Sequence, residues 1–330
     1  MSELSLQPVA DDAAWDALVR QSPQGTLFAG SAFLHAVGCP HQRWAVAQGQ
    51  AVKAALLLPV SADGSAVVAD DLVIHAGLMF TLDAQRQAVK RRHDTFEISS
   101  FVAAELARRF DRVELPLAPQ VDDMRPFLWH EYHGETGLQY RLDLRYTSYV
   151  DVSSLAGVPA DQSEQTACFQ AMETVRRYSV REARRKGGSV QLATDPAALL
   201  SGYRALMETQ GADAPPGRLT AMQRVMERLI ADGCGALFHV HDGDGTLLYA
   251  VFYAWDHHRA YYLYGAGHPG RSTPWQGTLA HWHAFGHLAR AHGITEVDLE
   301  GVNSPQRGWF KLGFGGSLQT YHTLHWSRPQ

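Results

Sequence analysis

The alternation of hydrophobic and polar residues in the second half of the chain predicts three antiparallel strands, then a helix and one more strand. These elements are expected at residues 236–241, 246–253, 259–264, 275–291 and 294–299. An Asp- and Gly-rich turn joins the first two strands, as in a hairpin, and Gly293 ends the helix. The third strand, its loop, the helix and the last strand form a βαβ unit. Its loop leads into a helix N-terminus, which can hold an anion because its N–H groups lack partners.

Apolar periodicity and short β-rich runs predict further elements on both sides of a break near residue 155. Helices are expected at 12–21, 95–110, 162–186, 196–209 and 218–232, with a short helical turn at 305–311. Strands are expected at 44–47, 52–60, 67–69, 72–74, 111–115, 140–152 and 189–192. The break at 153–159 predicts two domains, 1–155 and 156–330. The last strand, about 317–327, is a candidate to pack with the N-terminal domain.

Composition narrows the possible classes of protein. The 330 residues are 45% hydrophobic, enough for a substantial core, and carry a formal net charge of −5. Proteins that live on nucleic acid usually carry a basic surplus, so contact with RNA would need a local patch. No apolar stretch is long enough to span a bilayer, and the first residues lack the features of a signal peptide. Three widely separated cysteines argue against a disulfide framework. We therefore expect a cytoplasmic protein.

The 17 histidines raise the question of a metal site. His283 and His287 have the best spacing, because residues four apart share one face of a helix. A zinc protease, however, has Glu directly after the first histidine, where this chain has Ala284, and the chain has no Cys-x-x-Cys pair. Packing in the core or exposure at the surface explains these histidines better, and we expect no metal.

Three segments of the second half carry a family resemblance. They are RRYSVREARRKGG at 176–188, YGAG at 264–267 and FKLGFGG at 310–316. The first looks like a basic helix of the form R-x-x-I-R-x-A-x-x-x-G, and the third is similar to a closing F-K-x-x-F-G-G. In this order they resemble the GNAT acyltransferase fold and, more closely, its FemABX-like branch. The resemblance implies an α+β fold of two tandem GNAT-like domains, each with a mixed, mostly antiparallel sheet flanked by helices.

The first half looks more like the sugar N-acyltransferases of surface-polysaccharide pathways, at residues 25–28, 123–129 and 145–148. The resemblance implies transfer of an acyl group to the amine of a nucleotide-linked amino sugar. The donor would be acyl-CoA as co-substrate, or acyl carrier protein, with no permanently bound cofactor. Two alternatives stay open: an aminoacyl-tRNA-dependent transferase acting on a cell-wall precursor or small metabolite, and a non-catalytic GNAT-like binding module. The chain lacks the long charged arm of many peptidoglycan-bridge enzymes, which weighs modestly against RNA.

Amide formation from a thioester needs a base, a group that stabilises the oxyanion, and well-placed substrates. Asp298 and Glu300 are the predicted bases, because alternate residues of a strand share a face. His268 is a second candidate, since an imidazole titrates near neutrality. Lys311 is expected to meet a phosphate or the developing oxyanion, and the resemblance implies that it lies in the active site. Solvated carboxylates and a surface lysine are the plain alternatives.

Substrate-binding residues are predicted on a basic helix face, in an aromatic cluster, and at the start of the helix 275–291. They are Arg177, Arg181 and Arg185 on the face, Arg125, Trp129 and Tyr132 in the cluster, and Tyr264, Gln276 and Gly277 at the helix start. The arginines suit a diphosphate or the end of a tRNA, although basic residues also stabilise a helix C-terminus. The aromatic side chains suit a base or a hexose, although core packing explains them too. Gln276 and Gly277 are a fragment of the GNAT pyrophosphate signature. We expect Lys311 and the arginine-rich helix to point into one groove where the two lobes meet.

Overall fold

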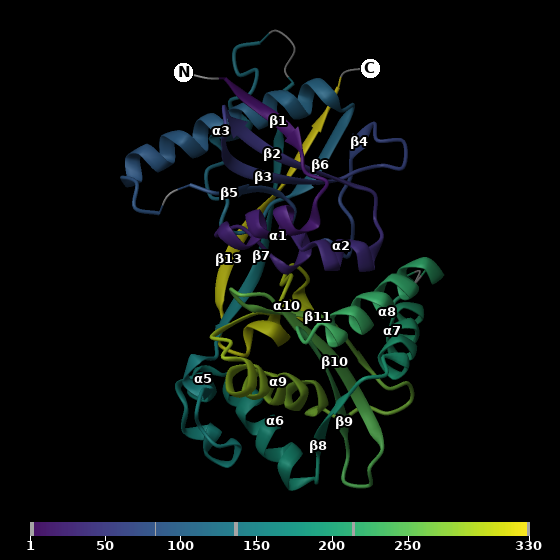
Figure 1. Ribbon diagram of the computed structural model, residues 1–330. Coiled ribbons are helices and arrows are strands. Elements are labelled where there is room, and N and C mark those ends of the chain that lie inside the picture. Colours follow the sequence, from purple (N-terminus) through teal and green to yellow (C-terminus); the bar gives the residue numbers. More distant parts are fainter. Residues whose placement is uncertain (1–2, 83, 135–137, 213–214, 329–330) are drawn as a thin grey trace. The chain divides into compact units, whose positions relative to one another are not determined.

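Figure 1 shows the computed structural model, which describes residues 3–82, 84–134, 138–212 and 215–328. The chain divides into two compact units. The first unit comprises Met1–Arg145 and Thr320–Gln330, and the second comprises Tyr146–Gln319. The change of unit falls within strand β7 (Arg141–Asp151), between residues 145 and 146. It therefore comes before the boundary expected at residue 155. The break in the sequence pattern at 153–159 marks the end of this strand, where the short helix η2 (Ser153–Leu155) follows.

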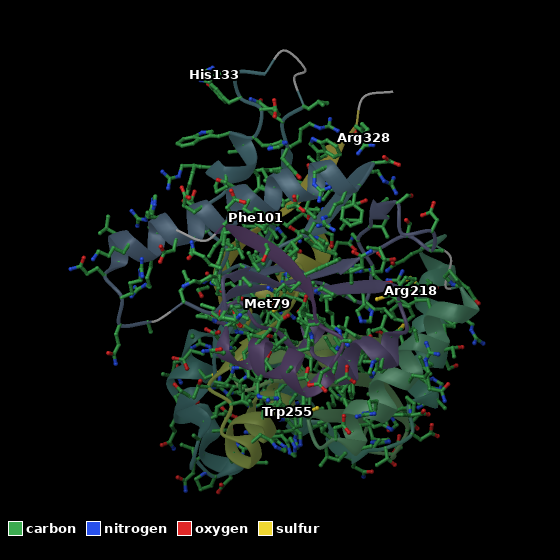
Figure 2. The ribbon with its side chains drawn as sticks, turned by 45° about the horizontal axis from the view of Figure 1, so that its top comes forward. Met79, Phe101, His133, Arg218, Trp255 and Arg328 are labelled. Carbon is green, nitrogen blue, oxygen red and sulfur yellow. The ribbon has the colours of Figure 1, made fainter. Side chains whose placement is uncertain are left out.

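The first unit contains an antiparallel four-stranded sheet in the order β1-β2-β3-β5. Its strands are β1 (Leu4–Pro8), β2 (His41–Gln48), β3 (Ala51–Pro59) and β5 (Gly77–Phe80). Its helices are η1 (Leu27–Ala29), α1 (Asp12–Gln21), α2 (Ser31–Val37), α3 (Ala88–Arg109) and α4 (Arg125–Leu128). Strand β6 (Arg112–Pro116) pairs with β4 (Ala66–Val67) and with the end of β13 (Ser317–Ser327). The side chains drawn in Figure 2 include the buried Met79 and the exposed Arg328.

The second unit contains a sheet in the order β7-β12-β11-β10-β9-β8. Its strands after β7 are β8 (Ser189–Ala193), β9 (Gly235–His241), β10 (Leu247–Trp255), β11 (Ala260–Gly267) and β12 (Glu296–Asp298). Only the pair β11–β12 is parallel, and the other neighbours are antiparallel. The three antiparallel strands and the βαβ unit predicted from the sequence are therefore confirmed.

Helices cover both faces of this second sheet (Figure 1). Helices α7 (Ala197–Thr209) and α8 (Pro216–Ala231) pack on β9–β11 from one side. Helix α9 (Gln276–His292) packs on the other side together with α6 (Thr174–Arg185). Gly293 ends α9 with φ 66° and donates its N–H to Leu288, a termination that favours glycine. The apolar face of α9 thus reaches the core, where Trp282, Phe285 and Leu288 are buried.

The single helix expected at 162–186 is wrong. The structure has three shorter helices there: η3 (Ala160–Gln165), α5 (Ala167–Ala171) and α6. Met172 and Glu173 are extended, and the N–H of Glu173 donates to the carbonyl of Gly313 at 2.9 Å. A hydrogen bond to a distant segment replaces the bond that would have continued the helix, so tertiary contacts decide this break.

Candidate functional site

The candidate site begins where strands β11 and β12 diverge. They pair at only two positions, Ala260 with Val297 and Tyr261 with Asp298. Strand β11 then continues to Gly267, whereas β12 ends at Asp298. Glu300 has φ 58° and turns the chain away, a conformation that is rare for a residue other than glycine. The strand expected at 294–299 is therefore shorter, and the divergence leaves a gap along one edge of β11.

Lys311 occupies this gap from helix α10 (Pro305–Leu312). Its Nζ donates to the carbonyl oxygens of Glu300 at 3.2 Å and Gly301 at 3.1 Å. The same Nζ lies 5.1 Å from the centre of the Tyr262 ring, within the range of a cation–π contact. If β12 continued alongside β11, the carbonyls of Glu300 and Gly301 could form hydrogen bonds with that strand. Lys311 donates to them instead.

Asp298 lies beside the gap and is completely buried. One oxygen, Oδ1, accepts hydrogen bonds from the Thr147 hydroxyl and, at 2.7 Å, from the Glu300 N–H. The other, Oδ2, has no hydrogen-bond partner among the described residues. Burial raises the pKa of Asp298 to about 6, although the Thr147 hydroxyl, the Glu300 N–H, Arg259 and Lys311 oppose the rise. A carboxylate with a free buried oxygen and a pKa near neutrality is suited to accept a proton.

Burial also favours the neutral forms of Glu300 and Lys311. Burial, and then the charge of Asp298, raise the pKa of Glu300 well above its usual value. Burial lowers the pKa of Lys311 to about 8, although Glu300 and Asp298 oppose this. Burial therefore favours the protonated form of Glu300, whereas Lys311, with a pKa of about 8, remains an ammonium ion near pH 7. Of the two carboxyl groups predicted as bases, Asp298 is the better suited.

Two tyrosine hydroxyls lie beside Gly265 of β11. The Tyr249 and Tyr262 hydroxyls both approach Gly265, and burial raises the pKa of each phenol. A Cβ atom at Gly265 would lie 2.5 Å from the Tyr262 oxygen and 2.7 Å from the Tyr249 oxygen. Gly265 is thus required here because its missing side chain makes room for both hydroxyls.

Helix α9 places a neutral histidine beneath this group. His281 is buried, and its Nδ1 shares a hydrogen bond with the Tyr253 hydroxyl. Its ring lies 4.7 Å from that of Tyr262 and 5.6 Å from that of Phe310, centre to centre. Burial, followed by the positive charges of Lys311 and Arg176, lowers the pKa of His281 to about 3. His281 is therefore an uncharged part of the packing that supports Tyr262 and the helix carrying Lys311.

Arg176 is the arginine of α6 that comes near this site. Its guanidinium lies 4.5 Å from the centre of the Phe310 ring, and Nη1 is 3.4 Å from the Thr278 hydroxyl in the first turn of α9. Its buried Nε has no hydrogen-bond partner among the described residues, and burial lowers its pKa. The sequence analysis predicts the face with Arg177, Arg181 and Arg185 as the binding face and does not include Arg176. The helical spacing of Arg176 from the apolar Val180 and Ala183, which are buried, could have indicated its position.

The arginines predicted to bind a diphosphate have partners of their own. Arg181 pairs with Glu164 at 2.8 Å, and Arg185 pairs with Glu182 at 2.6 Å. Arg177 donates hydrogen bonds to the side chains of Gln170 and Thr174. These guanidinium groups are already engaged by α6 and the segment before it, so binding a phosphate would require them to change partners.

The other predicted residues of the second unit lie around the loop before α9. His268 is exposed, and its Nδ1 donates to the carbonyl of Pro269. The side-chain oxygen of Gln276 accepts a hydrogen bond from the Thr273 N–H at 2.8 Å and so closes the loop onto the helix.

Gly277 lies against the Phe310 ring. A Cβ atom added at Gly277 would lie 3.2 Å from the nearest ring carbon. Tyr264 stacks on Phe252 with a centre-to-centre distance of 6.2 Å. Of His268, Tyr264, Gln276 and Gly277, only Gly277 contacts a described residue of α10, the helix that carries Lys311.

The aromatic cluster predicted in the first unit has a defined internal arrangement. Arg125 forms an ion pair with Asp123 at 2.5 Å. Its guanidinium lies 5.5 Å from the ring centres of both Phe96 and Trp129. Trp129 is 53% exposed and Tyr132 is 62% exposed. The Arg125 charge is thus neutralised locally, and the two aromatic side chains face solvent.

Comparison with known proteins identifies the fold of the chain. Residues 171–307 match the family model described as an acetyltransferase (GNAT) domain. A crystal structure of FemX has a TM-score of 0.61 and 15% identity, covering 96% of each chain. A tandem GNAT protein from the clavulanic acid biosynthesis pathway has a TM-score of 0.53 and 12% identity, covering 99% of this chain and 100% of that one. The structure of L-PGS from Bacillus licheniformis has a TM-score of 0.52 and 11% identity, covering 97% and 93%.

These similarities confirm the predicted α+β fold of two tandem GNAT-like domains. They also confirm the GNAT resemblance itself. No curated protein matches the sequence. The narrower resemblance to sugar N-acyltransferases stays a prediction. Among the described helices, none combines the length and the apolar character needed to cross a membrane.

Proposed function

We propose that the second unit is an N-acyltransferase that moves an acyl group from acyl-CoA to an amine by direct attack. The observation that carries this proposal is the divergence of β11 from β12, with Lys311 and Asp298 at the gap. A strand edge without a neighbour can pair with an extended ligand that carries amide groups. The pantetheine arm of CoA has two such amides, and the gap would receive it along residues 262–267.

The start of α9 would hold the diphosphate of the donor. A helix N-terminus offers unpaired N–H groups and a partial positive charge. The guanidinium of Arg176 reaches Thr278 in the first turn of this helix, and its Nε lacks a partner among the described residues. Arginine binds phosphate oxygens with directed hydrogen bonds. We therefore assign Arg176, rather than Arg177, Arg181 or Arg185, as the main cationic side chain for the donor.

Transfer would proceed through a tetrahedral intermediate. The amine nitrogen bonds to the thioester carbonyl carbon, and a proton of the amine passes to the free Oδ2 of Asp298. The ammonium of Lys311 stabilises the oxyanion on that carbon. When the intermediate collapses, the C–S bond breaks and the thiolate takes a proton from the Tyr262 hydroxyl. Tyr262 then regains a proton from solvent by way of the neighbouring Tyr249 hydroxyl. Asp298 releases the amine proton to solvent, so no proton is gained or lost over the cycle.

We propose a nucleotide-linked amino sugar as the acceptor, on the resemblance of the first half to sugar N-acyltransferases. Transfer from an aminoacyl-tRNA is the competing possibility. It is disfavoured because Arg181 and Arg184 are paired with Glu164, and Arg185 is paired with Glu182. Pairing with these two carboxylates offsets part of the positive charge of the face and so weakens its attraction for a phosphate backbone.

An assay of free thiol released from a panel of acyl-CoA donors tests this proposal. Nucleotide-linked amino sugars serve as acceptors, and a parallel reaction replaces the donor with charged tRNA. We expect one thiol per amide formed, dependent on the amine. Turnover only with charged tRNA would contradict acyl-CoA as the donor, and binding of donor and acceptor without any turnover would show a non-catalytic module.

A further inference from the structure

The face of α9 opposite the candidate site borders a separate pocket. Gly277 and His281, which touch Phe310, lie on one side of the helix. At about 100° per residue, Leu279, Trp282 and Gly286 lie on the other side. These three residues line a cavity of about 220 Å³ together with α6, β8 and the segment 155–163. Helix α9 therefore separates this pocket from Lys311.

The pocket combines an apolar lining with cationic side chains. Leu155, Leu279 and the ring of Trp282 supply apolar surface, while Arg184 and Arg290 supply positive charge. None of the described residues that line the pocket is acidic. Arg184 has a carboxylate partner in Glu164 at 2.5 Å. Arg290 is therefore the lining arginine that has no carboxylate partner among the described residues.

Arg290 is held against the pocket by a feature of its own helix. A Cβ atom at Gly286, four residues earlier, would lie 2.3 Å from Nη2 and 2.8 Å from Nη1 of Arg290. The guanidinium thus folds back over the helix backbone in space that any other residue would fill. It forms no ion pair or hydrogen bond with a described residue, and burial alone lowers its pKa. Although Arg290 is exposed, its guanidinium lies at the pocket and has no anionic partner among the described residues.

We propose that this pocket binds a small organic anion. The Arg290 guanidinium would hold the carboxylate or phosphate group, and the apolar part of the ligand would lie against Trp282 and Leu279. A charged hydrogen-bonded pair of this kind is roughly twice as strong as a neutral one. The size is adequate, since a protein cavity of about 150 Å³ can hold benzene. The site is distinct from the proposed acyl-transfer site and does not depend on it.

Benzoate and benzamide test the proposal, because they share one shape and differ in charge. We expect benzoate to bind the full-length protein at least about tenfold more tightly, as measured by calorimetry. The Arg290→Gln variant should lose that preference and leave benzamide binding unchanged. The control Arg228→Gln removes an exposed arginine that pairs with Asp232 on α8, and it should change neither affinity.

A second variant acts through position rather than charge. Gly286→Ala keeps Arg290 but displaces its guanidinium, and it should also weaken benzoate binding. Phenyl phosphate distinguishes the two head groups, because tighter binding than benzoate would assign a phosphate ligand. Equal binding of benzoate and benzamide, or benzoate binding that survives Arg290→Gln in a variant with unchanged melting temperature, would overturn the proposal.

Discussion

At the scale of single residues, Lys311 has one donor to spare. An ammonium group has three N–H bonds, and two of them point to the carbonyl oxygens of Glu300 and Gly301. The third can meet an oxyanion in the gap between β11 and β12. We expect Lys311→Met, which keeps the length of the side chain, to lower kcat/KM by about 10²- to 10³-fold, the usual cost of losing an oxyanion donor.

The exposed Lys186 of the same unit provides the matched control. Lys186→Met should leave kcat/KM within a factor of about two, because a solvated lysine contributes little. Retention of activity to the same degree by Lys311→Met, in a folded protein, would remove Lys311 from the mechanism.

The ionisation of Asp298 and Lys311 predicts the pH profile of the reaction. Asp298 must be ionised to act as a base, so activity should fall as pH drops through about 6. Lys311 must be protonated to stabilise the oxyanion, so activity should fall as pH rises through about 8. Asp298→Asn should remove the acidic limb and lower kcat/KM by about 10²- to 10⁴-fold. An acidic limb that persists in this variant would assign the base elsewhere.

His281 predicts how stability depends on pH. Its pKa falls from 6.5 to about 3 on folding, so the unfolded chain binds the extra proton first as the solution is acidified. The contribution of neutral His281 to the free energy of unfolding is fully present above pH 6.5. It is lost as pH decreases towards 3, by roughly 1.4 kcal/mol per pH unit. Chemical denaturation of His281→Gln should show a shallower loss between pH 6 and 4 than the unmodified protein. Equal slopes would contradict this.

Sequence reasoning located part of the residue cluster. The closing motif singled out Lys311, and the strand pattern singled out Asp298 and Glu300. It did not find Tyr249, Tyr262 or His281 as members of one cluster, because their contact depends on the packing of α9 against β10 and β11. Arg176 was missed for a similar reason, since a count of charges along α6 does not show which face is buried.

At the scale of elements, the central feature is the edge of β11 around Gly265. An alanine there would place its Cβ 2.5 Å from the Tyr262 oxygen and 2.7 Å from the Tyr249 oxygen. We expect Gly265→Ala to lower stability by about 1–3 kcal/mol, the usual cost of overpacking. It should also lower kcat/KM by displacing Tyr262. The melting temperature and the rate of thiol release measure the two effects.

Two further variants make this test specific. Gly217→Ala is the control, because no atom lies within 4 Å of its added methyl group. Combining Gly265→Ala with Tyr249→Phe removes one of the two hydroxyls that clash and should restore part of the lost stability. The absence of any rescue would show that the clash is not with this hydroxyl pair.

Some of these elements could be predicted from the sequence pattern alone. The hairpin strands, helix α9 and the turn at α10 have strong local signals, in Gly-rich turns, apolar periodicity and Gly293. The break at Met172–Glu173 and the early end of β12 have none. Both depend on partners elsewhere in the chain: Gly313 for Glu173, and Lys311 for the carbonyls that follow β12.

At the scale of the whole molecule, the order of elements was enough to predict the fold class. Each half places a crossover helix among antiparallel strands, and the structures similar to this chain share that tandem arrangement. The arrangement alone does not select a donor or an acceptor, because one fold supports many reactions. The donor proposed here rests on the gap beside β11, and a measurement at that gap is therefore the most direct test.

Hydrogen–deuterium exchange with and without CoA provides this measurement. If the pantetheine arm lies along the free edge of β11, CoA should slow exchange of the amides in residues 262–267 and in the first turn of α9. The turn 242–245, between β9 and β10, should be unaffected and serves as an internal reference. The account predicts protection at β11 that is reduced in Gly265→Ala. Unchanged exchange along 262–267 at saturating CoA would contradict it.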